Sequence, residues 1–207
     1  MKIFSYKMEH DYGLAPNPFG KYCTIAVCKS GIRKNKNIEV GDWVIGTGSI
    51  ALDNLHHLIY AMQVEEKLPI QDYWDDSRFE YKKPKLNGSL VQLYGDNIYH
   101  CKDNSEEWIQ ENGAHSFEGG AINEEHLKRD VGGRYVLISK VFYYFGNASI
   151  PIPKAYHEVC AKYRPMIWRK IPEVVRSEFV CWLTEHFTVG IHGDPINWKE
   201  HFVEEGE

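Results

Sequence analysis

The chain has 207 residues, 43% of them hydrophobic, so it is long enough to bury a sizeable core and too apolar to be disordered. Its formal net charge of −5 argues against a protein that holds nucleic acid by bulk electrostatic attraction, but leaves room for a small local basic patch. No apolar run reaches the roughly 18 residues of a membrane span, and the N-terminal residues lack the apolar core of a secretory signal, so we expect a cytoplasmic protein with no membrane contact.

The first part of the chain predicts two strands separated by an irregular loop. Residues 2–8 alternate and predict a strand, and the compact apolar run at 22–28 predicts a buried one. Residues 10–20 lie between them and hold two prolines and two glycines, which exclude regular structure. This loop either forms one side of a site or is a rigid surface loop. The basic segment 29–36 is interpreted as a solvated turn in preference to a phosphate contact.

The stretch 38–49 predicts a strand that starts with bulky residues and ends with small ones. Gly41-Asp42 is a turn signal, Trp43-Val44-Ile45 fits a pleated strand, and residues 46–49 (Gly-Thr-Gly-Ser) carry little bulk. Glycine inside a strand marks a bulge or the close approach of a ligand or another backbone. Two interpretations follow: one wall of a pocket, or a hairpin corner whose glycines only relieve crowding.

The middle of the chain predicts further strands and two short helices. Strands are expected at 57–66, at the start of 108–120 and, with the strongest pattern in the sequence, at 135–145. Short helices are expected at 69–76 and 123–130, the second one capped by Asn123.

Helical patterns occupy the last quarter of the chain. Residues 154–163 have helical periodicity, and 172–187 are amphipathic, with apolar residues three and four positions apart. The acidic tail after residue 202 is expected to fray.

No repeat or low-complexity linker divides the sequence, so we expect a single domain over residues 1–207. It would consist of a β-rich body over about 1–150 and a C-terminal helical extension over about 151–207. The alternative is a body that carries a semi-independent helical appendage.

The cysteines and histidines show no metal-binding spacing. Free thiols are expected because the cysteines are odd in number and no two form a Cys-x-x-Cys pair: Cys23, Cys28, Cys101, Cys160 and Cys181. The ten histidines are scattered, so we expect neither a metal site nor a cofactor.

Several blocks of sequence stand out together: 11–13 with 15–24, 41–49, 73–79 with 87–89, 94–99 and 142–146. As a set they resemble the nucleotide-modification-associated domain of the second type, a family of bacterial and phage proteins, over most of the chain. The resemblance implies a role near modified bases in DNA, in a DNA-modification or phage-defence context. It supplies no catalytic residues.

A second resemblance concerns the Val-Gly-Asp-Trp-Val-Ile segment, the small residues after it, and a later Tyr-Trp-Asp-Asp-Ser-Arg-Phe segment. These are similar to the PUA-like barrels, which include the EVE, YTH and ASCH domains, at positions 41–43, 48 and 49. The resemblance implies an α+β fold: a PUA-like mixed β-barrel with flanking and C-terminal helices. Such barrels bind nucleic acid, and several hold one modified base in an aromatic pocket. The acidic net charge and the helical region after residue 151 depart from a minimal barrel.

A modified base needs flat stacking faces and a few polar groups that read its edge. The candidate stacking residues are Trp43, Tyr12, Phe19, Tyr22 and Trp74. The candidate edge readers are Asn17, Thr47, Ser49, Asn87, Asp96 and Asn97, with Gly48 leaving room beside them. Trp43 is equally compatible with a core position, Tyr22 and Trp74 fit the core better than a site, and Asp96 is most simply a turn residue.

The sequence therefore predicts binding of a modified base, nucleotide or nucleic acid in an aromatic pocket. One alternative is a base- or nucleotide-modifying enzyme, with acid, base or ligand groups from Asp11, Asp42, Asp96 and His100 and with Cys23 as a nucleophile. No phosphate loop, Gly-x-Ser-x-Gly or deaminase motif accompanies these residues. A second alternative is an interaction module whose helices after Pro153 dock a partner protein. The oligomeric state is open.

Overall fold

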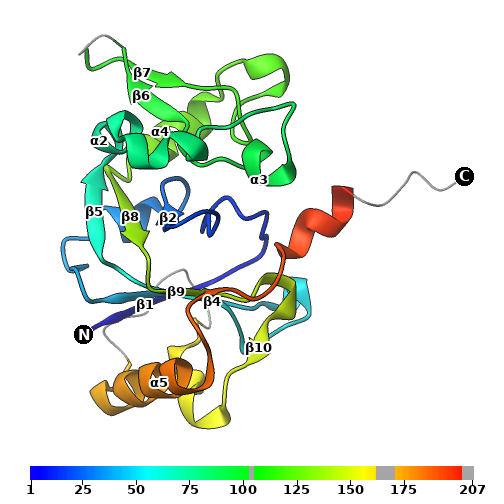
Figure 1. Ribbon diagram of the computed structural model, residues 1–207. Coiled ribbons are helices and arrows are strands. Elements are labelled where there is room, and N and C mark those ends of the chain that lie inside the picture. The colour runs from blue at the N-terminus through cyan, green and yellow to red at the C-terminus, as the bar shows by residue number, and fades with distance from the viewer. Residues whose placement is uncertain (103–104, 162–170, 202–207) are drawn as a thin grey trace, which may run out of the picture. The chain divides into compact units, whose positions relative to one another are not determined.

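The computed structural model describes residues 1–102, 105–161 and 171–201, drawn in Figure 1. The chain divides into two compact units, and each is built from separate stretches of sequence. The first unit comprises Met1–Tyr12, Ile38–Glu65 and Ser139–Glu207, and the second comprises Gly13–Asn37 and Glu66–Ile138. Among the described residues, no helix is both long enough and apolar enough to cross a membrane.

The first unit is built on a mixed sheet whose strands follow the order β1-β3-β4-β9-β11, with β10 also paired to β4. Its strands are β1 (Ile3–Lys7), β3 (Trp43–Thr47), β4 (His57–Gln63), β9 (Phe142–Tyr144), β10 (Ile150–Pro151) and β11 (Gly190–Ile191). β1 runs parallel to β3 and β11 runs parallel to β9, whereas the other pairs are antiparallel. The strands predicted at 2–8 and from Trp43 onward are confirmed.

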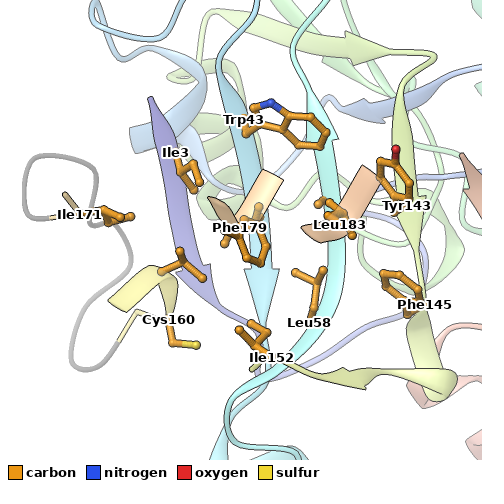
Figure 2. Close-up of a cluster of buried hydrophobic side chains, with 13 residues drawn as sticks. Ile3, Trp43, Leu58, Tyr143, Phe145, Ile152, Cys160, Ile171, Phe179 and Leu183 are labelled. Atoms are coloured by element: carbon orange, nitrogen blue, oxygen red, sulfur yellow. The ribbon is translucent and has the colours of Figure 1, made fainter. Parts of the chain in front are cut away.

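One face of this sheet is covered by α5 (Glu173–His186), which confirms the amphipathic helix predicted at 172–187. Phe179 and Leu183 of α5 are buried in a core cluster with Ile3, Trp43 and Leu58 from three strands, as Figure 2 shows. The remaining helical elements of this unit are short 3-10 turns: η1 (Ile50–Leu52), η4 (Gly146–Ala148), η5 (Lys154–Val159) and η6 (Ile196–His201). The helix predicted at 154–163 is thus a 3-10 turn as far as Val159; its last residues and the tail after 202 lie outside the described residues.

The second unit contains a three-stranded sheet in the order β2-β8-β5 and a separate pair, β6-β7. The strands are β2 (Cys23–Ile25), β5 (Glu66–Pro69), β6 (Tyr99–Cys101), β7 (Trp108–Gln110) and β8 (Tyr135–Ser139). Its helices are short: α1 (Ser30–Arg33), α2 (Ile70–Asp75), η2 (Ser77–Lys82), α3 (Leu90–Leu93), η3 (Glu118–Gly120) and α4 (Glu124–Val131). As predicted, residues 10–20 form no named strand or helix. Asn123 caps α4 by accepting a hydrogen bond from the backbone N–H of His126, also as predicted.

Two sequence expectations are wrong. The single strand predicted at 135–145 is two strands in different sheets, because the chain turns at Lys140 and Val141, whose backbone N–H groups donate to the Glu65 carboxylate. The segment 29–36 is not simply a solvated turn. It forms α1, and the Arg33 side chain is completely buried.

The fold class is mixed α+β, as expected. Each sheet in the described part of the chain is open, with β1 and β11 at the two edges of the largest one, so the PUA-like barrel is not confirmed. The single domain with a body ending near residue 150 stays a prediction. Strands and α5 from both sides of that position contribute to the first unit.

Truncating Phe179 should destabilise the protein strongly, because its ring is 0% exposed and packs against the sheet. We expect Phe179→Ala to lower the free energy of unfolding by about 3–5 kcal/mol, the usual range for a buried aromatic side chain. The matched control is Val174→Ala on the same helix, where the side chain is 60% exposed and the change should stay within about 0.5 kcal/mol. Urea unfolding followed by Trp fluorescence measures both. Equal losses for the two variants would contradict the packing.

Candidate active site

The residues that sequence analysis selected for ligand binding are divided between the two units. Five belong to the first unit: Tyr12, Trp43, Thr47, Gly48 and Ser49. Seven belong to the second unit: Asn17, Phe19, Tyr22, Trp74, Asn87, Asp96 and Asn97. Neither unit by itself holds the complete predicted set.

Trp43 is a core residue in this fold. Its side chain is 2% exposed, and its ring stacks on Tyr143 at a centroid distance of 6.2 Å. The small residues after it accommodate groups of the protein itself: a Cβ at Gly46 would lie 2.5 Å from the Met8 sulfur, and one at Gly48 would lie 1.9 Å from the Asn54 carbonyl oxygen. Of the two interpretations of this stretch, the packing favours the one in which glycine relieves crowding.

The buried polar residues that were selected as edge readers hold the second unit together. The Asp96 carboxylate accepts hydrogen bonds from Thr24 (2.6 Å) and from the hydroxyl of Tyr73 (2.8 Å). The Lys82 ammonium donates to the Asn17 side chain (2.7 Å), and Asn97 donates to two backbone carbonyls. Burial raises the pKa of Asp96 and lowers the pKa of Lys82 to about 8.

In the first unit, Thr47 donates to the Tyr6 carbonyl and Ser49 accepts from the backbone of Leu52. Asn87 is exposed, and the other selected aromatic residues are half-buried: Tyr12, Phe19, Tyr22 and Trp74. A ligand-binding role for these residues stays a prediction.

The groups selected for an enzyme mechanism are also occupied. Cys23 is fully buried, and burial raises the pKa of its thiol to about 12, so it is not an available nucleophile. Asp11 accepts from the hydroxyl of Tyr144 at 2.7 Å, and Asp42 accepts from the backbone N–H of Lys2 at 2.7 Å. His100 pairs with Glu111 at 2.8 Å.

A different cysteine has the surroundings of a nucleophile. Within the second unit, the Cys28 sulfur lies 3.6 Å from Nε2 of His115, and Nδ1 of the same ring lies 2.6 Å from an oxygen of Asp130. The imidazole therefore bridges a thiol and a carboxylate through its two nitrogens. This is the arrangement of nucleophile, base and orienting acid that cysteine- and serine-dependent enzymes use.

Cys28 occupies a sharp turn between a strand and a helix. The chain leaves β2 through two buried residues, adopts left-handed conformations at Cys28 (φ 52°) and Lys29 (φ 38°), and enters α1. Such conformations are uncommon for residues other than glycine and persist only where the surroundings impose them. Here the backbone N–H of Cys28 donates to Asp130 (2.8 Å), and its carbonyl accepts from the buried Arg33 guanidinium (2.8 Å).

Arg33 joins the turn at Cys28 to the segment that carries Asp130. Besides the Cys28 carbonyl, its guanidinium donates to the backbone carbonyls of Asp130 (2.6 Å) and Tyr135 (3.0 Å). A Cβ on Gly133 would lie 2.4 Å from the guanidinium carbon, so glycine is required there to admit the Arg33 side chain. Burial lowers the pKa of Arg33 to about 10, which still leaves it charged at neutral pH.

His115 is held by the buried side chain of Gln110. The Gln110 amide donates to the His115 carbonyl (3.0 Å) and to the Tyr99 hydroxyl (3.1 Å), and its oxygen accepts from the backbone of Asn123 (2.7 Å). The loop between β7 and α4 is thus tied down in the middle and at its end. The ring of His126 packs edge-on against the His115 ring at a centroid distance of 4.5 Å.

The electrostatics of the three groups favour a charged imidazole. Burial alone would lower the pKa of His115, but hydrogen bonds and negative charge from Asp130 and Cys28 outweigh it and raise that pKa to about 9. Burial would raise the pKa of Asp130, but the hydrogen bonds and charges of His115 and Arg129 lower it to about 2. At neutral pH the imidazolium and the carboxylate form an ion pair beside the thiol.

The same three residues could also be considered as a metal site, since their ligand atoms lie within 4.8 Å of one another. The hydrogen bonds of Asp130 argue against this interpretation. One carboxylate oxygen accepts from Cys28 N–H and Arg129, and the other accepts from Tyr99 and His115. A metal ion would have to displace at least one of these donors, whereas the thiol–imidazole–carboxylate arrangement uses all of them as they stand.

Sequence reasoning missed this site. Cys28 belongs to a run interpreted as a buried strand, His115 to an irregular loop, and Asp130 to the end of a short helix. The one local signal is a cysteine at the end of a buried strand, directly before Lys-Ser-Gly. That pattern is too common to single out a nucleophile.

Most of the chain matches the model of a known protein family. The family model described as "Nucleotide modification associated domain 2" matches residues 1–202. No curated protein and no solved structure matches the chain.

The pKa of His115 gives the stability of the protein a defined pH dependence. The pKa in the folded state, about 9, lies above the roughly 6.5 of an unfolded histidine, so its contribution to stability is complete below about pH 6.5 and is lost as the pH rises through 9. We expect the wild type to lose more free energy of unfolding between pH 6.5 and 9.5 than His115→Gln does. The matched control is His186→Gln, an exposed histidine of the first unit, which should keep the wild-type slope. Urea unfolding across this pH range measures the slopes, and parallel curves for wild type and His115→Gln would contradict the ion pair.

Proposed function

The chain belongs to the nucleotide modification associated domain 2 family, and from that membership and the Cys28 site we propose that it is a thiol-dependent enzyme acting on a nucleotide or nucleic-acid base. One observation carries the proposal: the His115 ring touches Cys28 through one nitrogen and Asp130 through the other. The family supports the nucleotide context, and the three side chains support the type of chemistry.

The proposed roles follow from the contacts. Cys28 is the nucleophile, because its sulfur lies 3.6 Å from Nε2 of His115, an imidazole nitrogen that can exchange a proton with the thiol. His115 holds and returns the proton. Asp130 orients the ring and stabilises its charge, because its carboxylate accepts from Nδ1.

The reaction class that fits these roles is transfer or hydrolysis of an acyl group. The Cys28 thiolate attacks a carbonyl carbon, the bond from that carbon to an amine or alkoxide breaks, and the His115 imidazolium gives its proton to the leaving group. A thioester results. Water or an incoming amine then attacks the thioester, His115 takes the proton of that nucleophile, and the Cys28 thiolate is released unchanged.

The sequence predicts binding of a modified base, and in this proposal the modified base is the substrate that the enzyme binds. A pocket around Trp43 has weaker support, because that indole is 2% exposed. A protein-docking role for the C-terminal helices keeps only part of its support. Of the two residues of the expected docking face, Phe179 packs into the first unit, whereas Val174 is 60% exposed.

Removing the nucleophile should abolish the reaction. The protein is incubated with modified and unmodified nucleotides and DNA, together with acyl and amine donors, and the products are digested to nucleosides for mass spectrometry. We expect the wild type to change nucleoside masses and Cys28→Ala to leave them unchanged. His115→Asn and Asp130→Asn should slow the change by about 10²–10⁴-fold, the usual size of a general acid–base contribution.

The matched control is Cys101→Ala, which removes a half-buried thiol from β6 in the same unit and should keep the wild-type rate. Intact-mass analysis adds a second readout, a covalent adduct on Cys28 that accumulates in His115→Asn. Nucleoside masses that stay constant with every donor, or a Cys28→Ala variant as active as wild type, would rule out the enzyme.

A further inference from the structure

Arg129 lies at the edge of the Cys28 site and is not needed for the proton transfers described above. It is on α4, directly before Asp130, and its Nε donates to an Asp130 carboxylate oxygen at 3.1 Å. Its Nη2 lies 4.0 Å from the Cys28 sulfur. The Arg129 side chain is 39% exposed, so it contacts the buried carboxylate while remaining partly open to solvent.

The hydrogen bonds leave one edge of this guanidinium for a ligand. Nε donates to Asp130, and in the described part of the chain the other hydrogen bond of the guanidinium is the long one from Nη2 to the Cys28 sulfur. The two terminal nitrogens therefore present a pair of parallel N–H donors, the geometry that binds a carboxylate or a phosphate through two oxygens. Asp130 does not turn to occupy this edge, because both of its oxygens already accept from other donors.

We propose that the substrate carries an anionic group, a carboxylate or a phosphate, directly beside the carbon that Cys28 attacks, and that Arg129 binds this group. The inference rests on the proposed thiol chemistry and specifies its substrate. Arg129 would bind the anionic group through hydrogen bonds of about 2.8 Å. Because Nη2 lies 4.0 Å from the Cys28 sulfur, a carbon directly bonded to that group then lies close to the sulfur. Arg129 is then a substrate-binding residue that positions the reacting carbon over the sulfur.

Two small alkylating reagents test the inference without knowledge of the natural substrate. Iodoacetate and iodoacetamide react alike: the thiolate forms a bond to carbon and iodide leaves. They differ in that only iodoacetate carries a carboxylate beside the reacting carbon. The rate at which each reagent alkylates Cys28 is measured by peptide mass spectrometry. We expect the ratio of the iodoacetate rate to the iodoacetamide rate to be higher in the folded wild type than in the denatured protein. Arg129→Gln should lower the ratio of the two rates by about three- to tenfold, the effect of one nearby charge at high dielectric.

Three comparisons separate an anion site from general effects on the thiol. Lys128→Gln removes the same charge from the exposed neighbouring position on α4 and should leave the ratio unchanged. Arg129→Lys should keep part of the preference. Inorganic phosphate and acetate are added as competitors against iodoacetate; stronger protection by phosphate assigns a phosphate group, and stronger protection by acetate assigns a carboxylate.

The outcomes distinguish this inference from the proposed function. Cys181 of α5 is exposed and serves as the reference thiol. If Cys28 reacts no faster than Cys181 with either reagent, both the thiol chemistry and the anion site are ruled out. A reactive Cys28 whose rates with both reagents fall equally in Arg129→Gln overturns the anion site alone, because Arg129 then only activates the thiol. A lower iodoacetate preference in Arg129→Gln but not in Lys128→Gln supports the inference.

Discussion

The arrangement of residues around Cys28 depends on one buried carboxylate. Asp130 is 0% exposed, and a charge in such a position is unfavourable unless hydrogen bonds replace its water. Four donors do so: the backbone of Cys28, the hydroxyl of Tyr99, the imidazole of His115 and the guanidinium of Arg129. These donors come from four different parts of the unit, so satisfying the carboxylate also fixes their relative positions. The contact that orients the His115 ring is therefore a contact on which the fold depends.

The unusual backbone at Cys28 has the same origin. Two consecutive residues in the left-handed region are unfavourable by on the order of 1–3 kcal/mol each, and they persist only when neighbouring groups hold them. Asp130 holds the N–H of Cys28, and Arg33 holds its carbonyl. Because Arg33 also donates to the backbone carbonyl of Asp130, Cys28 and Asp130 are connected through both a side chain and a main chain. A loosened Arg33 would relax the turn and separate the two.

The parts of this fold that follow from sequence are those with local signals. Alternation located β1, helical periodicity located α5, and an asparagine cap located the start of α4. The pattern at 135–145 predicts one strand where the structure has two, because the break between them depends on Glu65, which lies far away in sequence. The site is non-local in the same way. Cys28 and His115 are 87 residues apart, and nothing in either neighbourhood indicates the other. The glycines near Trp43 were a real signal of close approach, but the approaching groups are Met8, Tyr60 and Asn54.

Two buried carboxylates in the second unit show why burial alone does not mark a functional group. Asp96 receives its hydrogen bonds from the neutral hydroxyls of Thr24 and Tyr73, and burial raises its pKa. Asp130 receives two of its bonds from charged groups, His115 and Arg129, and its pKa falls to about 2. At Asp96 burial outweighs both the hydroxyl donors and the charge of Lys82, whereas at Asp130 the hydrogen bonds and charges of His115 and Arg129 outweigh burial. The two cysteines differ in parallel: Cys23 is sealed within β2, and Cys28 lies where the chain leaves the sheet, within 3.6 Å of that imidazole. The surroundings of the two thiols thus differ in the charge of the neighbours and in their position relative to the end of the strand.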